Sequence, residues 1–335
     1  MRVKIVTKME WPSFRNVAVN INKALSSHCN CTIYDQTNAK PGGNILFIGT
    51  ASNQTLKFLS KFLGRSNIVF YGTIEGHSFV DEASLRIAKQ VKILAVSNFV
   101  KQMLEEIGVP VAGVVHHGLD MDNRRVDTQF YEVLKKKLKN KKMIFTVCAN
   151  HSRKALDNLL YGYRLVEQEF KNAYLILHSE PAGYYNVSKI ARNLKLKRLW
   201  LTNLYGKLSI SKLNALYKLC SVYVQPSYCE GFGLPILEAF RFDKPVVAGD
   251  APPFNEVIRQ GENGILVPLS KITWFNFANQ VLFKMHMYRA EDLAHAVLEL
   301  VTNQQYLAKM QEKIRKEKYN WSSHKLYPEL LNYFT

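Results

Sequence analysis

Short apolar runs rich in β-branched residues alternate along the chain with longer segments whose apolar residues recur at three- and four-residue spacing. The first pattern predicts buried strands and the second predicts amphipathic helices. In the first part of the chain the predicted strands are Val3–Val6, Ile45–Ile48, Ile68–Tyr71, Ile93–Val96 and Val111–Val115. In the second part they are Met143–Cys148, Tyr174–Leu177, Trp200–Leu201, Val222–Gln225, Val246–Ala248 and Ile265–Val267. Strands joined by crossover helices predict parallel sheets of the α/β class.

The alternation pauses at a lysine-rich stretch just before residue 143, which we interpret as a solvated linker or helix face rather than a binding patch. Two consecutive doubly wound, Rossmann-like sheets fit this pattern better than one very wide sheet. We therefore predict a first domain at 1–139 and a second at 140–318. The aromatic-rich segment 319–335 is predicted to be a helix that packs back on the first domain.

Composition narrows the class of protein. Apolar residues make up 47% of the 335 positions, which excludes a disordered chain. No apolar run approaches the ~18 residues of a membrane span and the N-terminus lacks a signal-peptide pattern, so we expect a soluble, cytoplasmic protein. The five cysteines are scattered, unlike a disulfide framework or a zinc site. The net charge of +18 is shared by both halves and favours an acidic partner: a nucleotide, a nucleic acid or an anionic lipid surface.

The segment from Val222 to Asp250 carries the strongest chemical pattern. A predicted strand ends at Pro226, a turn contains two glycines, and Pro235 begins the next helix. Glycine permits positive φ and close approach of a ligand, and the first amides of a helix have no partner within it. We expect the turn residues to form a phosphate or hydroxyl cradle at the carboxyl end of a parallel strand: Gly231, Phe232, Gly233 and Leu234.

Two carboxylates flank this turn, Glu230 at the strand end and Glu238 about one turn into the helix. Carboxylates accept hydrogen bonds from vicinal hydroxyls, which both a ribose and a hexose supply. As a bare pair they are a weak signal, because Glu238 is equally explained as an acid near a helix N-terminus.

The complete string Pro226-Ser227, Glu230-Gly231-Phe232-Gly233-Leu234-Pro235 and Glu238-Ala239 resembles the E-x7-E signature of retaining GT-B glycosyltransferases, specifically glycosyltransferase family 4. The downstream matches are Lys244–Val247, Glu256–Ile258 and Gly261–Pro268, and weaker ones are Val96–Asn98, His117–Asp120, Gly206 with Leu213–Tyr217, and Tyr319–Tyr333. The resemblance implies a GT-B fold, with the two domains facing a central cleft. The resemblance is weak over the first 90 residues, which lie in the domain that receives the acceptor in such enzymes.

The resemblance also places Arg153 and Lys154 in a loop whose basic residues hold the donor diphosphate. Fixed positive charge there would stabilise a departing diphosphate. Outside that context the two would be ordinary surface charges. His77 falls where some members of the family place a histidine beside the donor sugar, although a loop histidine is more often an ordinary polar residue.

Asp120-Met121-Asp122 has the form of a D-x-D metal motif, but that motif belongs to a different glycosyltransferase fold. Without a second acidic cluster nearby we expect no metal and no cofactor.

The resemblance therefore implies a hexosyltransferase that uses a UDP- or GDP-sugar and retains the anomeric configuration. Its acceptor is unidentified: a glycan, a lipid or a protein, with nucleic acid less favoured. The alternatives are a GT-B nucleotide-sugar epimerase and, in a different class, a basic nucleic-acid-binding protein. Peripheral contact with an anionic membrane through basic faces such as Lys189 and Arg192 is a further hypothesis.

Overall fold

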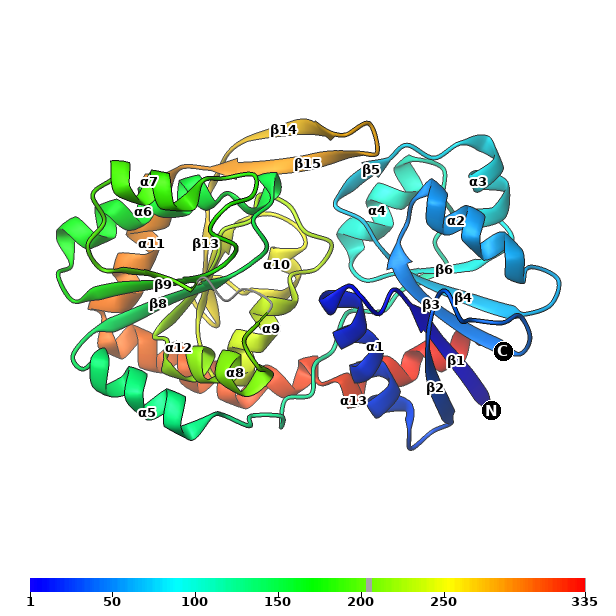
Figure 1. Cartoon of the computed structure of the whole chain (residues 1–335), viewed down its shortest axis with the longest axis horizontal. Helices are drawn as coiled ribbons and strands as arrows, with labels where there is room; N and C mark the ends of the chain where they lie inside the picture. The colour runs from blue at the N-terminus through cyan, green and yellow to red at the C-terminus, as the bar shows by residue number, and fades with distance from the viewer. Residues whose placement is uncertain (203–206, 335) are drawn as a thin grey trace.

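The computed structural model describes residues 1–202 and 207–334, so Gly206 lies outside the described residues. Two six-stranded sheets stand side by side, each sandwiched between helices (Figure 1). Every strand pair within these two sheets is parallel. The predicted α/β class with two Rossmann-like domains is confirmed.

The first sheet has the order β2-β1-β3-β4-β6-β7. Its strands are β1 (Arg2–Thr7), β2 (Asn30–Asp35), β3 (Asn44–Thr50), β4 (Asn67–Thr73), β6 (Lys92–Ala95) and β7 (Gly113–Val114). The helices of this domain are α1 (Pro12–Leu25), α2 (Asn53–Leu59), the short 3-10 helix η1 (Ser60–Phe62), α3 (Glu82–Ala88) and α4 (Asn98–Glu106). Its central strands are apolar almost throughout because helices cover both faces of the sheet.

The second sheet has the order β10-β9-β8-β11-β12-β13. Its strands are β8 (Lys142–Val147), β9 (Ala173–His178), β10 (Leu199–Leu201), β11 (Val222–Gln225), β12 (Val246–Gly249) and β13 (Gly264–Val267). The associated helices are α5 (Thr128–Lys137), the 3-10 helix η2 (Ser152–Lys154), α6 (Leu156–Glu169), α7 (Val187–Asn193), α8 (Ile210–Leu219), α9 (Leu234–Arg241), α10 (Phe254–Val257) and α11 (Ala290–Thr302).

Helix α5 packs against α8, although the predicted first domain extended to residue 139. The amide of Asp127 donates to the carbonyl of Ser211, and the Asn214 side chain donates to the carbonyl of Arg125. In the structure the chain has therefore already passed to the second sheet before α5 begins. The lysine-rich end of α5 is exposed, as its interpretation as a solvated helix face requires.

A third, antiparallel sheet joins the two domains and was not predicted. A hairpin of the second domain, β14 (Leu269–Phe277) and β15 (Val281–Tyr288), reaches across to β5 (Gly76–Ser78) of the first domain. Figure 1 shows this hairpin spanning the gap along the top of the view.

The C-terminal segment crosses between the domains, as predicted, below the hairpin in Figure 1. It consists of α12 (Gln304–Glu317), η3 (Lys318–Trp321), α13 (Ser323–Leu326) and η4 (Tyr327–Phe334). Helix α13 packs against α1, and η4 packs against α1 and β4, where Tyr327, Leu330 and Phe334 are buried. Among the described residues, no helix combines the length and the apolar character that a membrane crossing requires.

Candidate active site

A charged cluster forms where β8 and β11 end, at the edge of the second sheet that faces the first domain. The loop after β8 carries Arg153 and Lys154, and the loop after β11 carries Glu230. Arg153 Nη1 lies 2.6 Å from Glu230 Oε2, and Lys154 Nζ contacts the other oxygen of the same carboxylate. The structure thus brings together three residues that the sequence assigned to one site.

Glu230 is only 7% exposed and its carboxylate is fully engaged. Besides the two cations, Ser227 Oγ donates to it at 2.7 Å and Gln225 Nε2 at 3.2 Å. Burial alone would raise the pKa of Glu230, but Arg153 and Lys154 outweigh burial and lower this pKa to about 2. At neutral pH the group is therefore an ionised hydrogen-bond acceptor.

Glu75, which sequence reasoning missed, completes the cluster from the first domain. Its Oε1 lies 3.0 Å from Arg153 Nη2. Burial would lower the pKa of Arg153, but the two carboxylates, Glu230 and Glu75, raise it above its ordinary value. The sequence offered one signal for Glu75, its position two residues after the end of β4. Open α/β sheets bind ligands at the carboxyl ends of their parallel strands.

His77 lies in β5 and its contacts are outside this cluster. Its Nε2 is 2.6 Å from Glu106 Oε2, and its ring is 4.5 Å from that of Trp274 on the hairpin. The structure therefore gives His77 a place in the junction between hairpin and first domain. Its role beside a donor sugar stays a prediction.

The glycine turn lies at the carboxyl end of β11, as expected, and residues of the first domain cover it. A Cβ on Gly231 would lie 1.9 Å from Thr73 Oγ1, and Ser97 Oγ donates to the Gly231 carbonyl at 2.7 Å. Phe232 is 4% exposed and packs its ring against that of His117. The first domain thus covers the turn in this closed arrangement, and a ligand at the turn requires the domains to separate.

The start of α9 keeps the features expected of an anion cradle. Gly233 has φ +95° and is the N-cap residue, and within the described chain no side chain caps this helix. Leu234 and Pro235 begin the helix. Pro235 has no N–H and the amide of Ile236 donates to the Gly233 carbonyl at 2.9 Å, which leaves the Leu234 amide without a partner in the helix.

Glu238 lies one turn into α9, half-buried, and does not join the charged cluster. It accepts a hydrogen bond of 2.6 Å from the hydroxyl of Tyr217. Burial and the Glu238 carboxylate together raise the pKa of Tyr217 well above its ordinary value, so this hydroxyl stays a donor.

The hairpin lies against the charged cluster. The ring of Phe283 on β15 is 5.9 Å from the Arg153 guanidinium carbon, and Phe277 packs on His151 at 4.7 Å between ring centroids. Burial first, and then the positive charges of Arg153 and Lys154, lower the pKa of His151 to about 4. The loop after β8 is therefore held between the hairpin and the first domain.

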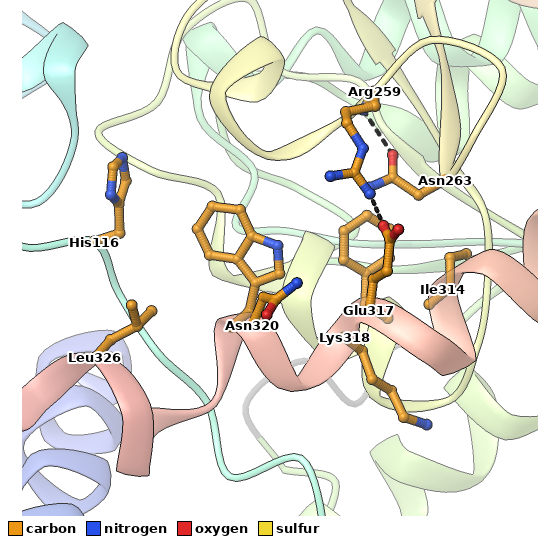
Figure 2. A pocket seen from close by; sticks show the side chains of 10 residues that line it. His116, Arg259, Asn263, Ile314, Glu317, Lys318, Asn320 and Leu326 are labelled. Carbon is orange, nitrogen blue, oxygen red and sulfur yellow. Dashed lines mark hydrogen bonds and ion pairs between the residues drawn. The ribbon is translucent and has the colours of Figure 1, made fainter.

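A cavity of about 210 Å³ lies beside the C-terminal segment that crosses between the domains (Figure 2). His116 lines it from the first domain's side, and Arg259 and Glu317 line it from the other side, paired with each other. The ring of Trp321 lies 5.8 Å from His116 and 6.1 Å from Phe232. Since Arg259 and Glu317 neutralise each other and His116 is paired with Glu256, we assign no ligand to this cavity.

The D-x-D motif forms structural contacts. Lys23 Nζ lies 2.5 Å from Asp120 Oδ2, and the Tyr319 hydroxyl donates to Asp122 Oδ1 at 2.9 Å. Within residues 1–202 and 207–334, no group of three or more His, Cys, Asp or Glu side chains is arranged to hold a metal ion. That activity needs no metal stays a prediction.

Comparisons with known proteins agree with this geometry. Residues 129–276 match the family model of glycosyl transferases group 1. "Uncharacterized glycosyltransferase 335" of Sulfolobus islandicus rod-shaped virus 1 is 23% identical over 264 residues, which cover 73% of this chain and 74% of that protein. The serotype-specific mannosyltransferase WbdA of Escherichia coli is 32% identical over 118 residues, 34% of this chain and only 14% of WbdA.

Solved structures share the fold over the full length. HepE of Anabaena, in complex with UDP-glucose, superposes with a TM-score of 0.74 at 14% identity, covering 99% of this chain and 98% of HepE. Sucrose-phosphate synthase of Thermosynechococcus elongatus superposes with a TM-score of 0.75 at 11% identity, covering 99% and 98% of the two chains. With residues 129–276 matching glycosyl transferases group 1 and the whole chain adopting the GT-B fold, the protein is a glycosyltransferase of GT-B type.

Proposed function

We propose that this enzyme transfers a hexose from a nucleoside-diphosphate sugar, with retention of the anomeric configuration, to an acceptor that enters from the first domain. The observation that carries the proposal is the cluster of Arg153, Lys154 and Glu230 at the carboxyl edge of the second sheet, facing the first domain. In this geometry two cations converge on a carboxylate that is ionised at neutral pH.

Arg153 and Lys154 would hold the donor diphosphate. They are now neutralised by Glu230 and Glu75, and a diphosphate carries enough negative charge to replace Glu75 as the partner of Arg153. Because Glu75 belongs to the first domain, this exchange fits donor entry with the domains apart. The fixed cations then stabilise the charge that develops as the diphosphate leaves.

The two glutamates would divide the hydroxyl groups of the donor. Glu230 is ionised at neutral pH. Once Arg153 and Lys154 turn to the diphosphate, its carboxylate would accept hydrogen bonds from the transferred sugar, and Glu238 would accept them from the ribose. The first amides of α9 would face the diphosphate. Departure of the leaving group and attack of the acceptor on the same face of the ring is the retaining mechanism we propose.

Relatives support the donor class. HepE was crystallised with UDP, with UDP and glucose, and with UDP-glucose, and several curated relatives are named mannosyltransferases. We therefore propose a UDP- or GDP-sugar as the donor. The relatives are named as transferases, which favours transfer over epimerisation.

A thermal-shift series with UDP-, GDP- and ADP-sugars tests the donor class, because a ligand that binds only the native state raises Tm. The kcat and KM of the wild type and the variants are then measured with the sugar nucleotide that raises Tm. Lys154→Ala should lower kcat at least tenfold, in line with the loss of one charge-stabilising group. Glu238→Ala should raise the KM for the donor.

The control is Lys189→Ala, which removes an exposed lysine on α7 and should leave both constants unchanged. Unchanged kinetics in both Lys154→Ala and Glu238→Ala would contradict the site assignment. Release of an isomeric sugar nucleotide from donor incubated without acceptor would instead identify an epimerase.

A further inference from the structure

A second strongly basic concavity lies at the opposite edge of the second sheet. It is a cavity of about 440 Å³, between the ends of α8 and α9 and the flanks of α5 and α12. Lys218 lies just before β11 and Lys244 just before β12, whereas Glu230 and Arg153 follow the carboxyl ends of β11 and β8. The cavity is therefore separated from the charged cluster by the length of the strands.

Positive charge dominates this basic pocket. Among the described residues that line it, four are cations, Arg124, Lys218, Lys244 and Arg315, and Asp243 is the single acidic side chain. Asp243 Oδ2 already forms ion pairs with Arg124 Nη1 at 4.0 Å and with Arg315 Nε at 3.6 Å.

Asp243 is also occupied by a cation from outside the pocket wall. Lys318, which is buried, places its Nζ 2.5 Å from Asp243 Oδ1. One carboxylate therefore cannot balance the positive charge around it.

Within the described chain neither Lys218 nor Lys244 forms an ion pair. Lys218 Nζ lies over the ring of Tyr131, 4.7 Å from its centroid. Lys244 is half-buried, and burial lowers its pKa although the nearby Cys220 and Asp243 oppose that shift; the charge of Lys218 lowers this pKa further. A partly desolvated ammonium group without a direct ion pair is costly, and a bound anion would lower that cost.

We propose that the basic pocket binds a small phosphate-bearing molecule. Guanidinium groups bind phosphate through paired hydrogen bonds and lysines bind it as point charges, and the pocket offers two of each. Its volume falls within the range of about 300–1,000 Å³ typical of small-molecule sites. Because the cations line a concavity formed by several chain segments, the ligand is a free molecule rather than a membrane surface. This site does not depend on the proposed donor site.

Calorimetric titration with inorganic phosphate and with pyrophosphate, at constant ionic strength, tests the proposal. Lys218→Gln/Lys244→Gln should weaken pyrophosphate binding at the pocket at least fivefold. The matched control, Lys189→Gln/Lys197→Gln, removes the same charge from exposed positions and should keep the wild-type affinity. Lys154→Gln should leave the pocket's share of the binding intact.

The exposed side chain of Lys218 allows a single variant that cannot disturb the core. Lys218→Gln alone should weaken binding at least twofold, so the proposal stays testable if the double variant folds poorly. Equal affinity in wild type and pocket variants, or equal losses in both double variants, would overturn it. So would complete loss of binding in Lys154→Gln, or pocket-dependent co-sedimentation with phosphatidylglycerol vesicles without any response to free pyrophosphate.

Discussion

At the scale of single residues, Arg153 forms ion pairs with carboxylates of both domains. It is bound by Glu230 of its own domain and by Glu75 of the other, and all three side chains are mostly buried. The first-domain carboxylate of Glu75 thus pairs with the same guanidinium group that we propose binds the donor diphosphate. Glu75 would therefore compete with the donor.

Glu75→Gln should consequently tighten the binding of UDP or GDP, whichever the enzyme prefers, by about fivefold, or about 1 kcal/mol. The change removes a competing negative charge but keeps a side chain of similar size. Calorimetry measures the dissociation constant. Glu106→Gln, at a first-domain carboxylate that pairs with His77 instead, is the control. Weaker binding in Glu75→Gln would show that Glu75 assists the donor rather than competing with it.

Glu230 should contribute to stability in a pH-dependent way. Its folded pKa of about 2 lies below its ordinary value of 4.5, so its contribution is present above pH 4.5 and is lost as the pH falls towards 2. The full difference corresponds to about 3 kcal/mol. Urea unfolding between pH 5 and pH 3 should therefore show a smaller loss of unfolding free energy in Glu230→Gln than in wild type. The exposed Glu262→Gln variant should behave as wild type, and identical pH profiles for wild type and Glu230→Gln would refute this contribution.

At the scale of elements, the hairpin β14–β15 connects the two domains by strand pairing. The pairing of β15 with β5 aligns Phe283 with Gly76 and Leu282 with His77. Gly76 is required by this close approach, since a Cβ there would lie 1.9 Å from the backbone oxygen of Leu282. Because that neighbour is backbone, no side-chain rotation can relieve the clash.

Gly76→Ala should therefore separate the hairpin from the first domain while both large sheets remain folded. We expect faster cleavage of the 277–281 turn in limited proteolysis and a destabilisation of about 1–3 kcal/mol. Gly64→Ala is the control: it has φ +71° but no atom within 4 Å of the added Cβ, so it reports strain without a clash. Equal protease resistance in Gly76→Ala and wild type would show that this strand pairing does not hold the hairpin.

The hairpin also shows why some elements escaped prediction. Most strands of the two parallel sheets were visible because burial on both faces makes them continuous apolar runs. The edge strand β2 was missed, because none of its residues is fully buried. In β14, exposed Ile272, Trp274 and Phe277 stand among polar residues, so neither a buried run nor a helical period appears. Strand β5 has only the three residues Gly76–Ser78, too few to establish any period.

At the scale of the whole molecule, Glu256 links the two domains next to the cavity that His116 lines. From α10 of the second domain it accepts hydrogen bonds from the amides of Asn98 and Phe99 at 2.9 Å each, at the first turn of α4. It also pairs with His116 Nε2 at 2.9 Å. An anion at the positive end of a helix is favourable, so this single side chain joins the second domain to a first-domain helix.

Glu256→Ala should loosen the closed arrangement and lower the unfolding free energy by about 2 kcal/mol, as expected when a charged acceptor of several hydrogen bonds is lost. Small-angle X-ray scattering should show a larger radius of gyration without ligand. Glu262→Ala, whose partners Arg259 and Lys313 lie in its own half of the molecule, should change neither quantity. An unchanged radius in Glu256→Ala would show that other contacts hold the domains together.

The sequence by itself determined the α/β class, the two parallel sheets and the loops that carry Arg153, Lys154 and Glu230. These follow from local patterns: buried runs, helical spacing, and glycines and acids at strand ends. Only the tertiary structure decided that Glu75 completes the cluster, that the first domain covers the Gly231 turn, and that four cations gather around Asp243 in the described lining of the basic pocket. Each of these joins segments distant in sequence, and their charges and close approaches exist only once the separate elements have packed together.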